Sequence, residues 1–358
     1  MNRTFVALGG DFPNIGDAVI RRVTLSWVRS TEPVDAFLAT APDAWLEQVG
    51  IKAGDRVYRG RRSSLRWVKE LLLSRGRPLL IHEPGEVALD RQAFIRECVL
   101  LTACVVAKIK RGRVVFPPRS VARRKEARPW GPTRFVHRTA CRVADAVYWR
   151  EPSSLVTVGI GELAPDVCFG ADIREGLQPG ARKTIGVSLR GSRPLPSAEW
   201  FEGLKRAADR LGAVIVPFAQ VESDQRRAAE LAEMFEVQPL PWSSDLLAHE
   251  EALRRLYDGA ISIVSDRLHV LIIGSLSGAV PIELVPRPAE KVARHFHQVR
   301  IDDISHDSSN MSASDVEKTV LAAQDRGTEV RLAVSAANGE VRRVAARVRS
   351  WQGSGRQS

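Results

Sequence analysis

Short apolar runs recur along the chain, and each is followed by a segment whose apolar residues recur every three or four positions. The first pattern is typical of buried strands and the second of amphipathic helices. In the first half, the expected strands cover residues 4–8, 34–38, 78–82, 114–117 and 146–149. The expected helices between them cover residues 18–28, 65–73, 91–108 and 133–144. This alternation predicts a parallel sheet covered by helices on both faces.

The same alternation restarts after a polar stretch with Pro and Gly at residues 174–183. Further strands are expected at residues 184–189, 213–218, 261–265 and 280–285. Further helices are expected at residues 198–211, 222–235, 245–257, 269–277, 312–326 and 329–348. The fold class is therefore α/β, with two Rossmann-like domains whose parallel sheets face a central cleft. We predict a first domain at 1–175, a second at 176–349 and a flexible tail at 350–358.

The net charge of +11 over 358 residues raises the question of a nucleic-acid partner. The densest basic run covers residues 108–142, but its aromatic residues are not spaced as a stacking platform. No helix-turn-helix, zinc-finger or RNA-binding motif is visible, so no specific nucleic acid is expected. A solvated basic face is the favoured interpretation. Weak peripheral attraction to an anionic membrane surface fits the same charge.

Other features of the sequence bear on location and metal binding. No apolar stretch reaches the length of about 18 residues that a membrane-spanning helix needs, and the start lacks a secretory cleavage site. A cytoplasmic protein is therefore expected, with its four cysteines acting as small buried side chains. His295 and His297 lack the partners that would complete a zinc site, so we expect surface histidines and no metal.

The strongest candidate for chemistry follows the expected strand 261–265. Arg267 and His269 lie where that strand ends and the next helix begins. Ligands of open α/β sheets bind beyond the carboxyl ends of strands, and a helix N-terminus favours anions. Arginine binds phosphate or carboxylate through two parallel hydrogen bonds. The alternative is an arginine that caps a neighbouring carbonyl and a histidine satisfied inside the protein.

A second candidate is the glycine-containing loop at residues 9–17. It follows a strand and opens a helix, but it is neither a GxGxxG sequence nor a P-loop. Asn14 and Asp17 are the residues that we expect to contact sugar hydroxyls there, and Gly16 is a substrate-binding candidate because glycine permits close approach of the backbone to a ligand. Ordinary loop turning, with Asp17 as a helix N-cap, explains the same residues equally well.

Polar residues also follow other expected strands. Arg150, Arg190 and Gln220 come directly or shortly after strand ends, and Lys291 lies in the helix after residues 280–285. These residues are candidates for substrate binding at the same edge of the two sheets. Arg150 has an alternative role as a partner of Glu151 or another neighbour.

Several of these segments together resemble the polysaccharide pyruvyl transferases, whose fold is similar to the two-domain GT-B glycosyltransferases. The resemblance covers residues from about 5 to about 300 and is most specific at Ser-Asp-Arg-Leu-His (265–269), with Gly-Ala-Val-Pro (278–281) behind it. Other segments that resemble the family are Asn-Ile-Gly-Asp (14–17), Val-Phe-Pro-Pro (115–118), Trp-Arg-Glu-Pro-Ser-Ser (149–154), Pro-Asp-Val-Cys-Phe (165–169) and Lys291. Glu151 stands where the family commonly has aspartate, and the segment Glu-Pro-Gly-Glu (83–86) replaces a glycine-rich loop.

The resemblance implies a donor, an acceptor and roles for individual residues. The donor is phosphoenolpyruvate, the acceptor is a glycan or lipid-linked sugar of the cell surface, and the product is a pyruvate ketal. Arg267 and Arg150 would bind the donor, with Lys291 or Arg190 in support, and no cofactor is implied. His269 would act as general acid and Asp17 would orient or deprotonate an acceptor hydroxyl. The first domain would hold the acceptor and the second the donor.

Two other functions remain open from the sequence. One is a GT-B-type glycosyltransferase that uses a nucleotide sugar. The other is a non-catalytic protein that binds anions or nucleic acid, prompted by the net charge of +11.

Overall fold

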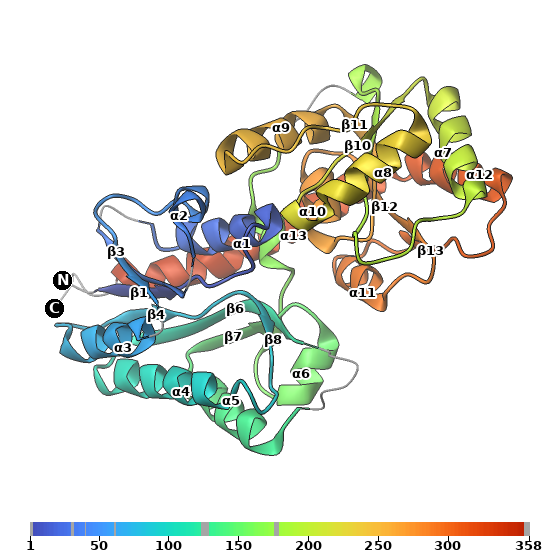
Figure 1. Ribbon diagram of the computed structural model, residues 1–358. Coiled ribbons are helices and arrows are strands. Elements are labelled where there is room, and N and C mark those ends of the chain that lie inside the picture. Colours follow the sequence, from blue (N-terminus) through green and yellow to red (C-terminus); the bar gives the residue numbers. More distant parts are fainter. Residues whose placement is uncertain are drawn as a thin grey trace. The chain divides into compact units, whose positions relative to one another are not determined.

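The computed structural model describes residues 3–29, 32–39, 41–60, 62–122, 129–174 and 179–353 of the chain. Two compact units are present (Figure 1). The first unit contains Met1–Phe12, Asp17–Val167 and Glu340–Ser358, and the second contains Pro13–Gly16 and Cys168–Gly339. The division therefore falls before Cys168 instead of near residue 175, and both units are discontinuous in sequence.

The first unit is built on an eight-stranded sheet with the order β3-β2-β1-β4-β6-β7-β8, and β5 also pairs with β6. The pairings are parallel, as the strand–helix alternation predicted. The strands are β1 (Thr4–Ala7), β2 (Val34–Ala39), β3 (Arg56–Arg59), β4 (Leu79–Ile81), β5 (Gly85–Val87), β6 (Arg113–Val121), β7 (Ala146–Trp149) and β8 (Glu162–Leu163). The chain places β2 and β3 on one side of β1 and continues from β4 on the other. The order of strands thus reverses between β1 and β4.

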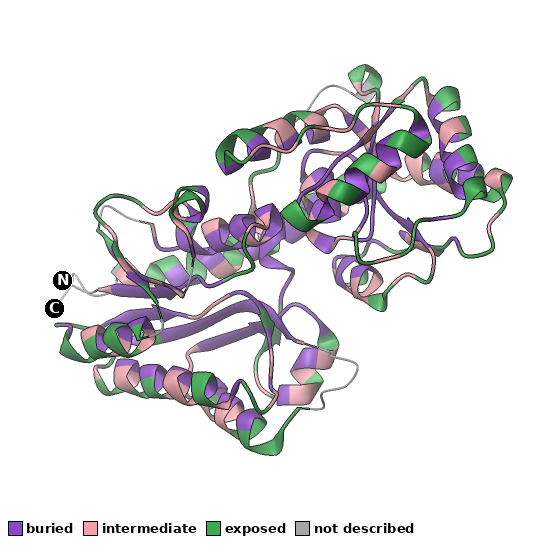
Figure 2. Ribbon diagram, in the orientation of Figure 1, coloured by how far each residue is buried: buried purple, intermediate pink, exposed green. Residues whose placement is uncertain are grey.

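Helices cover this sheet on both faces because its central strands are apolar on both sides (Figure 2). The helices of the first unit are α1 (Ile15–Ser26), α2 (Asp43–Val49), α3 (Ser63–Leu73), α4 (Phe94–Ile109), α5 (Gly131–Val143) and α6 (Pro152–Val158). Helices α3, α4 and α5 pack on one face, where Trp67, Leu100, Cys104 and Phe116 share one core. Three of the four cysteines are buried and Cys98 is half-buried.

The second unit is built on a five-stranded parallel sheet with the order β10-β9-β11-β12-β13. Its strands are β9 (Thr184–Ser188), β10 (Val214–Pro217), β11 (Ala260–Ser265), β12 (Val280–Val285) and β13 (Ser305–Asp307). Its helices are α7 (Ala198–Leu211), α8 (Gln225–Phe235), α9 (Leu246–Asp258), α10 (Leu268–Leu276), α11 (Glu290–Gln298) and α12 (Ala313–Asp325). Here the order of strands reverses between β9 and β11, and this point positions the candidate site.

The closing helix α13 (Gly327–Gly353) begins in the second unit and ends in the first. Its last turns cover β7, where Val344 and Trp351 pack against Ala146 and Tyr148. The tail expected from residue 350 is therefore helical as far as Gly353, and residues 354–358 lie outside the described part of the chain. The helix extends past residue 348 because its apolar side meets the sheet of the first unit.

The basic run at residues 108–142 is in part the solvated face that its charge suggested, since Arg111, Arg113, Arg134 and Arg142 are exposed. It contains all of β6, most of which is buried, and Arg119 on that strand is fully buried. The guanidinium of Arg119 lies 4.0 Å from the centre of the Phe116 ring and 2.7 Å from Nδ1 of His82. Residues 123–128 of the run lie outside the described residues.

Candidate functional site

The carboxyl ends of β9 and β11 lie side by side at the point where the strand order of the second unit reverses. Arg190 and Arg193 follow β9, and Asp266 follows β11. The backbone N–H of Arg190 donates to Oδ1 of Asp266 at 3.0 Å, and Nε of Arg193 lies 3.1 Å from Oδ2. Ligands of open α/β sheets bind at such a reversal, so this edge is the first place to look for a substrate.

A second buried carboxylate, that of Asp224, contacts both the loop that follows β9 and the residue that precedes α10. Asp224 closes the short helix Glu222–Asp224 and accepts a hydrogen bond from the backbone N–H of Gly191 at 3.0 Å. Its other oxygen accepts a short hydrogen bond from Nε of Arg267, the residue that precedes α10. Asp224 therefore holds Arg267 against the loop that follows β9.

Arg190, Arg193 and Arg267 together form what we call the arginine cluster. Three guanidinium groups face two buried carboxylates, so the cluster carries an excess of positive charge. Their side chains are 37%, 28% and 17% exposed, so each retains access to solvent. Burial lowers the pKa of Arg190, and the positive charges of Arg267 and Arg193 lower it further. The carboxylate of Asp266 opposes this shift only in part. An anion bound here would offset that repulsion.

Glu283 adds a titrating group beside the arginine cluster. It lies on β12, is fully buried and accepts a short hydrogen bond from Ser305 Oγ. Burial raises the pKa of its carboxyl to about 7, in spite of the opposing effect of Arg193 and Arg190. A carboxyl with a pKa near neutrality is suited to proton transfer.

Replacing Glu283 by glutamine should remove a pH dependence of stability. The carboxyl titrates near pH 4.5 when unfolded and near 7 when folded, so the folded state loses stability as pH rises between these values. A shift of this size corresponds to roughly 3 kcal/mol. Urea unfolding at pH 5 and pH 8 measures it: the loss of unfolding free energy from pH 5 to pH 8 should be roughly 3 kcal/mol larger for the wild type than for Glu283→Gln. The exposed Glu233→Gln is the control, and a Glu283→Gln protein with the same pH dependence of stability as the wild type would contradict the shift.

His269 lies in the first turn of α10, against the segment 13–16 that belongs to the same unit. A Cβ atom placed on Gly16 would lie 2.6 Å from Cβ of His269 and 2.8 Å from Nε2 of Gln220. Oε1 of Gln220 accepts a hydrogen bond from Tyr257, which orients its amide. Asn14 forms a backbone bridge with Val221 in the same place. The structure thus brings together Asn14, Gly16, Gln220 and His269, which the sequence placed in three separate candidates.

Asp17 is not the N-cap that the sequence allowed, because α1 begins two residues earlier at Ile15. Its carboxylate accepts a hydrogen bond from the backbone N–H of Asp11 at 2.8 Å and pairs with Arg21 at 3.3 Å. Arg21 also reaches Glu83 at 3.3 Å. Burial raises the pKa of Glu83, which follows β4 at the strand reversal of the first unit. Glu83 is therefore a second acidic candidate on this unit.

Arg150 takes the paired role that the sequence offered as its alternative. Its side chain is buried in the first unit and donates to Asp166 at 2.6 Å and to Ser120 Oγ at 3.0 Å. It also lies 3.4 Å from Glu86. These contacts fix the strand end of β7 and are those of a structural ion pair.

Lys291 lies in the first turn of α11, and its backbone carbonyl accepts a hydrogen bond from Nδ1 of His295 at 2.8 Å. His295 is buried, so it is not the surface histidine that was expected, because it faces the core side of an amphipathic helix. His297 is exposed and pairs with Asp302 at 2.5 Å.

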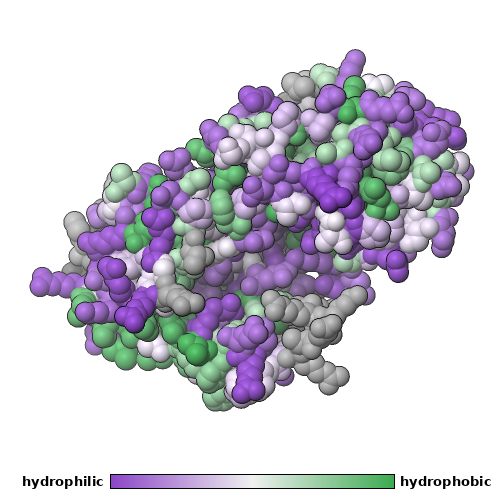
Figure 3. Space-filling view, viewed as in Figure 1, coloured by the Kyte–Doolittle hydropathy of each residue, from purple (hydrophilic) through white to green (hydrophobic). Residues whose placement is uncertain are grey.

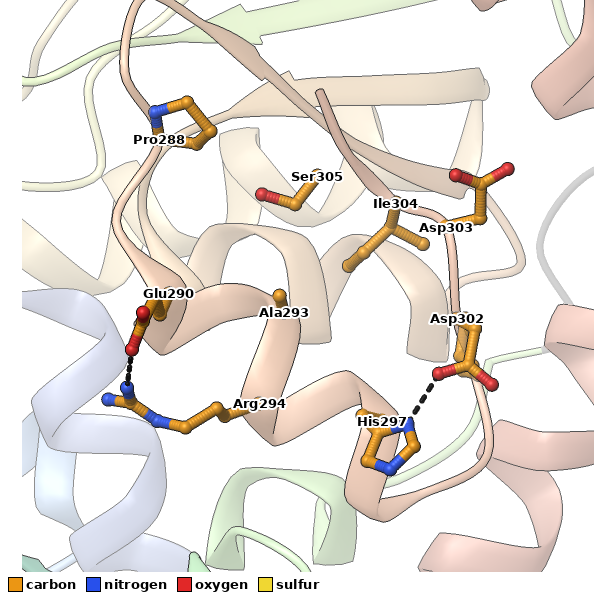
Figure 4. A pocket seen from close by; sticks show the side chains of 10 residues that line it. Pro288, Glu290, Ala293, Arg294, His297, Asp302, Asp303, Ile304 and Ser305 are labelled. Atoms are coloured by element: carbon orange, nitrogen blue, oxygen red, sulfur yellow. Dashed lines mark hydrogen bonds and ion pairs between the residues drawn. The ribbon is translucent and has the colours of Figure 1, made fainter. Parts of the chain in front are cut away.

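A pocket of about 580 Å³ lies between α11 and the chain that enters β13 (Figure 4). Four of its polar groups form two pairs, since Arg294 contacts Glu290 at 2.8 Å and His297 contacts Asp302. The residues that line it are Pro288, Glu290, Ala293, Arg294, His297, Ile301, Asp302, Asp303, Ile304 and Ser305. None of the substrate-binding residues expected from the sequence is among them, so we keep the carboxyl edge of the sheet as the candidate site.

Sequence analysis did not single out Arg193, Asp224, Asp266, Glu283 or Glu83. Arg193, Asp266 and Glu83 lie in the loops that follow strands, and Asp224 lies in the short helix after β10, so the strand-end rule, applied to every polar residue there, would have found these four. Glu283 lies within a strand and gave no such signal. Among the described residues, no group of three or more His, Cys, Asp or Glu side chains is arranged to hold a metal ion. None of the described helices combines the length and apolar content needed to cross a bilayer.

Comparisons with known proteins identify the fold. No protein-family model matches the sequence, and no curated protein does. HepE of Anabaena, solved in complex with UDP, is 13% identical over 99% of this chain and 100% of its own, with a TM-score of 0.55. A putative UDP-N-acetylglucosamine 2-epimerase from Listeria monocytogenes is 13% identical over 98% of this chain and 96% of its own, with a TM-score of 0.57. CalG4, the calicheamicin glycosyltransferase, is 13% identical over 98% of each chain, with a TM-score of 0.53.

These proteins have the GT-B fold, and the two parallel α/β sheets of this chain match it along its whole length. The expected fold class, α/β with two Rossmann-like domains, is thereby confirmed. At 13% identity the similarity defines the fold and not the activity.

Proposed function

We propose that this chain is a GT-B-fold transferase of glycan assembly that binds a phosphate-bearing donor at the arginine cluster of its second unit. The observation that carries the proposal is the position of that cluster at the strand reversal. Three arginines face two buried carboxylates there, next to the N-terminus of α10. Guanidinium groups and a helix N-terminus are both suited to phosphate and carboxylate groups.

The donor that fits the sequence resemblance is phosphoenolpyruvate, with transfer of its pyruvyl group to two hydroxyls of a sugar. In this reaction a general acid protonates the methylene carbon, and one acceptor hydroxyl adds to the central carbon and loses its proton. The second hydroxyl then replaces the phosphate, which leaves a cyclic ketal and inorganic phosphate. His269 is the proposed acid, because it lies in the turn that Arg267 opens. The donor's two anionic groups call for several fixed cations, which the cluster supplies.

By this proposal the acceptor sugar binds to the residues around Arg21 in the first unit. Glu83 and Asp17 both pair with Arg21 beside the loop that follows β1. Carboxylates at a strand reversal are suited to accept hydrogen bonds from sugar hydroxyls. Glu83 has the raised pKa that favours proton removal, so we assign it the role of base ahead of Asp17.

A second candidate is a nucleotide-sugar enzyme on the same fold. The names of the structural neighbours favour it, since HepE was solved with UDP and others are UDP-sugar epimerases or glycosyltransferases. The loops that follow β9, β11 and β12 (189–197, 266–267 and 286–289) hold arginines and no aromatic residue that would stack on a base. This composition favours the smaller donor.

The two candidates differ in what stabilises the protein and in what they release. Thermal unfolding with phosphoenolpyruvate, UDP or GDP should show stabilisation by phosphoenolpyruvate. Incubation with phosphoenolpyruvate and a panel of glycolipid precursors should release phosphate. His269→Gln should bind the donor but release phosphate about 100- to 10,000-fold more slowly. Stabilisation by UDP or GDP alone would overturn pyruvyl transfer in favour of the second candidate.

A further inference from the structure

The outer face of the first unit carries apolar side chains that no part of the described chain covers. Helices α3, α4 and α5 lie next to one another on one face of the sheet, and their outer sides are exposed (Figures 1 and 2). Large apolar side chains on those outer sides are exposed at Leu65, Leu72, Leu73, Ile95, Val105, Ile109 and Phe135. We call these residues, together with the basic residues between them, the α3–α5 face.

Helix α4, the middle one of the three, is apolar on both of its sides. Its inner side is buried in the core at Leu100, Cys104 and Ala107. Its outer side follows the positions 95, 98, 102, 105 and 109, which share one side of a helix and hold Ile, Cys, Thr, Val and Ile. Ile95 and Ile109 are each 76% exposed. Apart from Arg96, Glu97 and Lys108, α4 holds no charged residue, and a helix that is apolar on both sides is normally buried on both, so the outer side of α4 lacks the cover that its composition calls for.

The charges around this apolar stripe are almost all positive. Helix α5 contributes Arg134, Arg138 and Arg142 and holds no acidic residue. Helix α3 contributes Arg66 and Lys69, both exposed. The two acidic residues of the three helices are engaged elsewhere, since Glu70 pairs with Arg3 and Glu97 is buried against His137. Figure 3 shows hydrophobic and hydrophilic groups interspersed over this region.

We propose that the α3–α5 face binds an anionic lipid bilayer surface. Exposed apolar side chains enter the boundary between headgroups and acyl chains, and flanking arginines and lysines contact anionic headgroups. A bilayer requires no complementary shape, and long basic side chains extend to the headgroups while their stems cover apolar surface. The inference rests on the exposure and charge of these helices and is independent of the donor reaction.

The test is sedimentation of the full chain with lipid vesicles in the absence of any donor. Vesicles of phosphatidylcholine with about one third phosphatidylglycerol should bind the protein, and vesicles of phosphatidylcholine alone should bind it much less. The variant Ile95→Gln/Val105→Gln/Ile109→Gln should lower binding about 10-fold or more. The matched control is Met234→Gln/Leu247→Gln/Leu332→Gln, which alters three exposed apolar residues of 44%, 45% and 68% exposure on the second unit. Circular dichroism confirms that each variant folds.

Several outcomes would overturn the proposal. Equal binding of both triple variants would assign vesicle binding to the net charge and not to the α3–α5 face. Absence of binding at low salt would exclude the bilayer. A wild-type dimer that the first triple variant converts to a monomer would assign the face to a second copy of the chain. The expected result is different: the first triple variant loses vesicle binding and retains phosphate release, which separates this inference from the proposed function.

Discussion

Replacing Arg267 by alanine is expected to lower kcat/KM for the donor about 100- to 1000-fold, which is the cost of removing one fixed donor group from a charged site. The variant lacks the contact with the donor that we propose for Arg267, and Asp224 loses the guanidinium that neutralises it. An uncompensated carboxylate would then repel the anionic donor. Both effects act in the same direction, and for this reason the expected loss is large. Steady-state phosphate release measures the loss of turnover, and donor titration by thermal shift measures the loss of donor binding.

Two further variants make the Arg267 result specific. Arg267→Lys keeps the charge but not the planar fork, so it should recover only part of the loss. Arg226→Ala removes an arginine that is 91% exposed and pairs with Glu230 on α8, and it should leave activity unchanged. A folded Arg267→Ala protein that binds phosphoenolpyruvate as tightly as the wild type would exclude the arginine cluster as the donor site.

Gly16→Ala is expected to destabilise the protein by about 1–3 kcal/mol, the usual cost of overpacking a filled site. The new methyl group would lie 2.6 Å from Cβ of His269, an atom fixed to the backbone of α10 that cannot turn away. The segment 13–16 and the start of α10 must therefore move apart, which would displace His269 and reduce turnover as well. The midpoint of thermal unfolding and the rate of phosphate release both report the change.

Gly339→Ala is the matched control for this substitution. Gly339 lies inside α13, and nothing lies within 4 Å of a Cβ atom placed there. Alanine favours a helix interior over glycine by about 1 kcal/mol, so this variant should be slightly more stable than the wild type. If Gly16→Ala were as stable as Gly339→Ala, the close approach of the loop to His269 would be disproved.

Elements with a clear apolar pattern were predictable from the sequence, including the four-residue strands β1 and β7, and short elements with a weak pattern were not. Helix α7 was expected at residues 198–211 and occurs there, with Ser197 as its N-cap. Strand β3 was missed because it has only two adjacent apolar residues between two arginines, which resembles a polar loop. Helix α13 was recognised as a helix, but an amphipathic pattern does not say which sheet it will cover. Only tertiary contacts determine that α13 begins in the second unit and ends in the first.

The candidate site shows the same limit. Residue type and the end of a strand were enough to single out Arg190, Arg267 and His269. Their partners were not predictable, because Asp224 meets Arg267 across 43 positions of sequence. Nor did the sequence tell apart a buried ion pair from a ligand contact at Arg150, since that depends on the position of Asp166.

The path of α13 has a consequence for the order in which the protein matures on the ribosome. Synthesis proceeds from the amino end, and domains generally fold as they emerge. The sheet of the first unit is complete once β8 has been made, yet the turns that shield Ala146 and Tyr148 come from the end of the chain. Arg347 then donates to Tyr148 Oη, and Gln352 donates to the carbonyl of Val28. The sheet of the first unit is therefore covered by α13 only after the second unit has been translated.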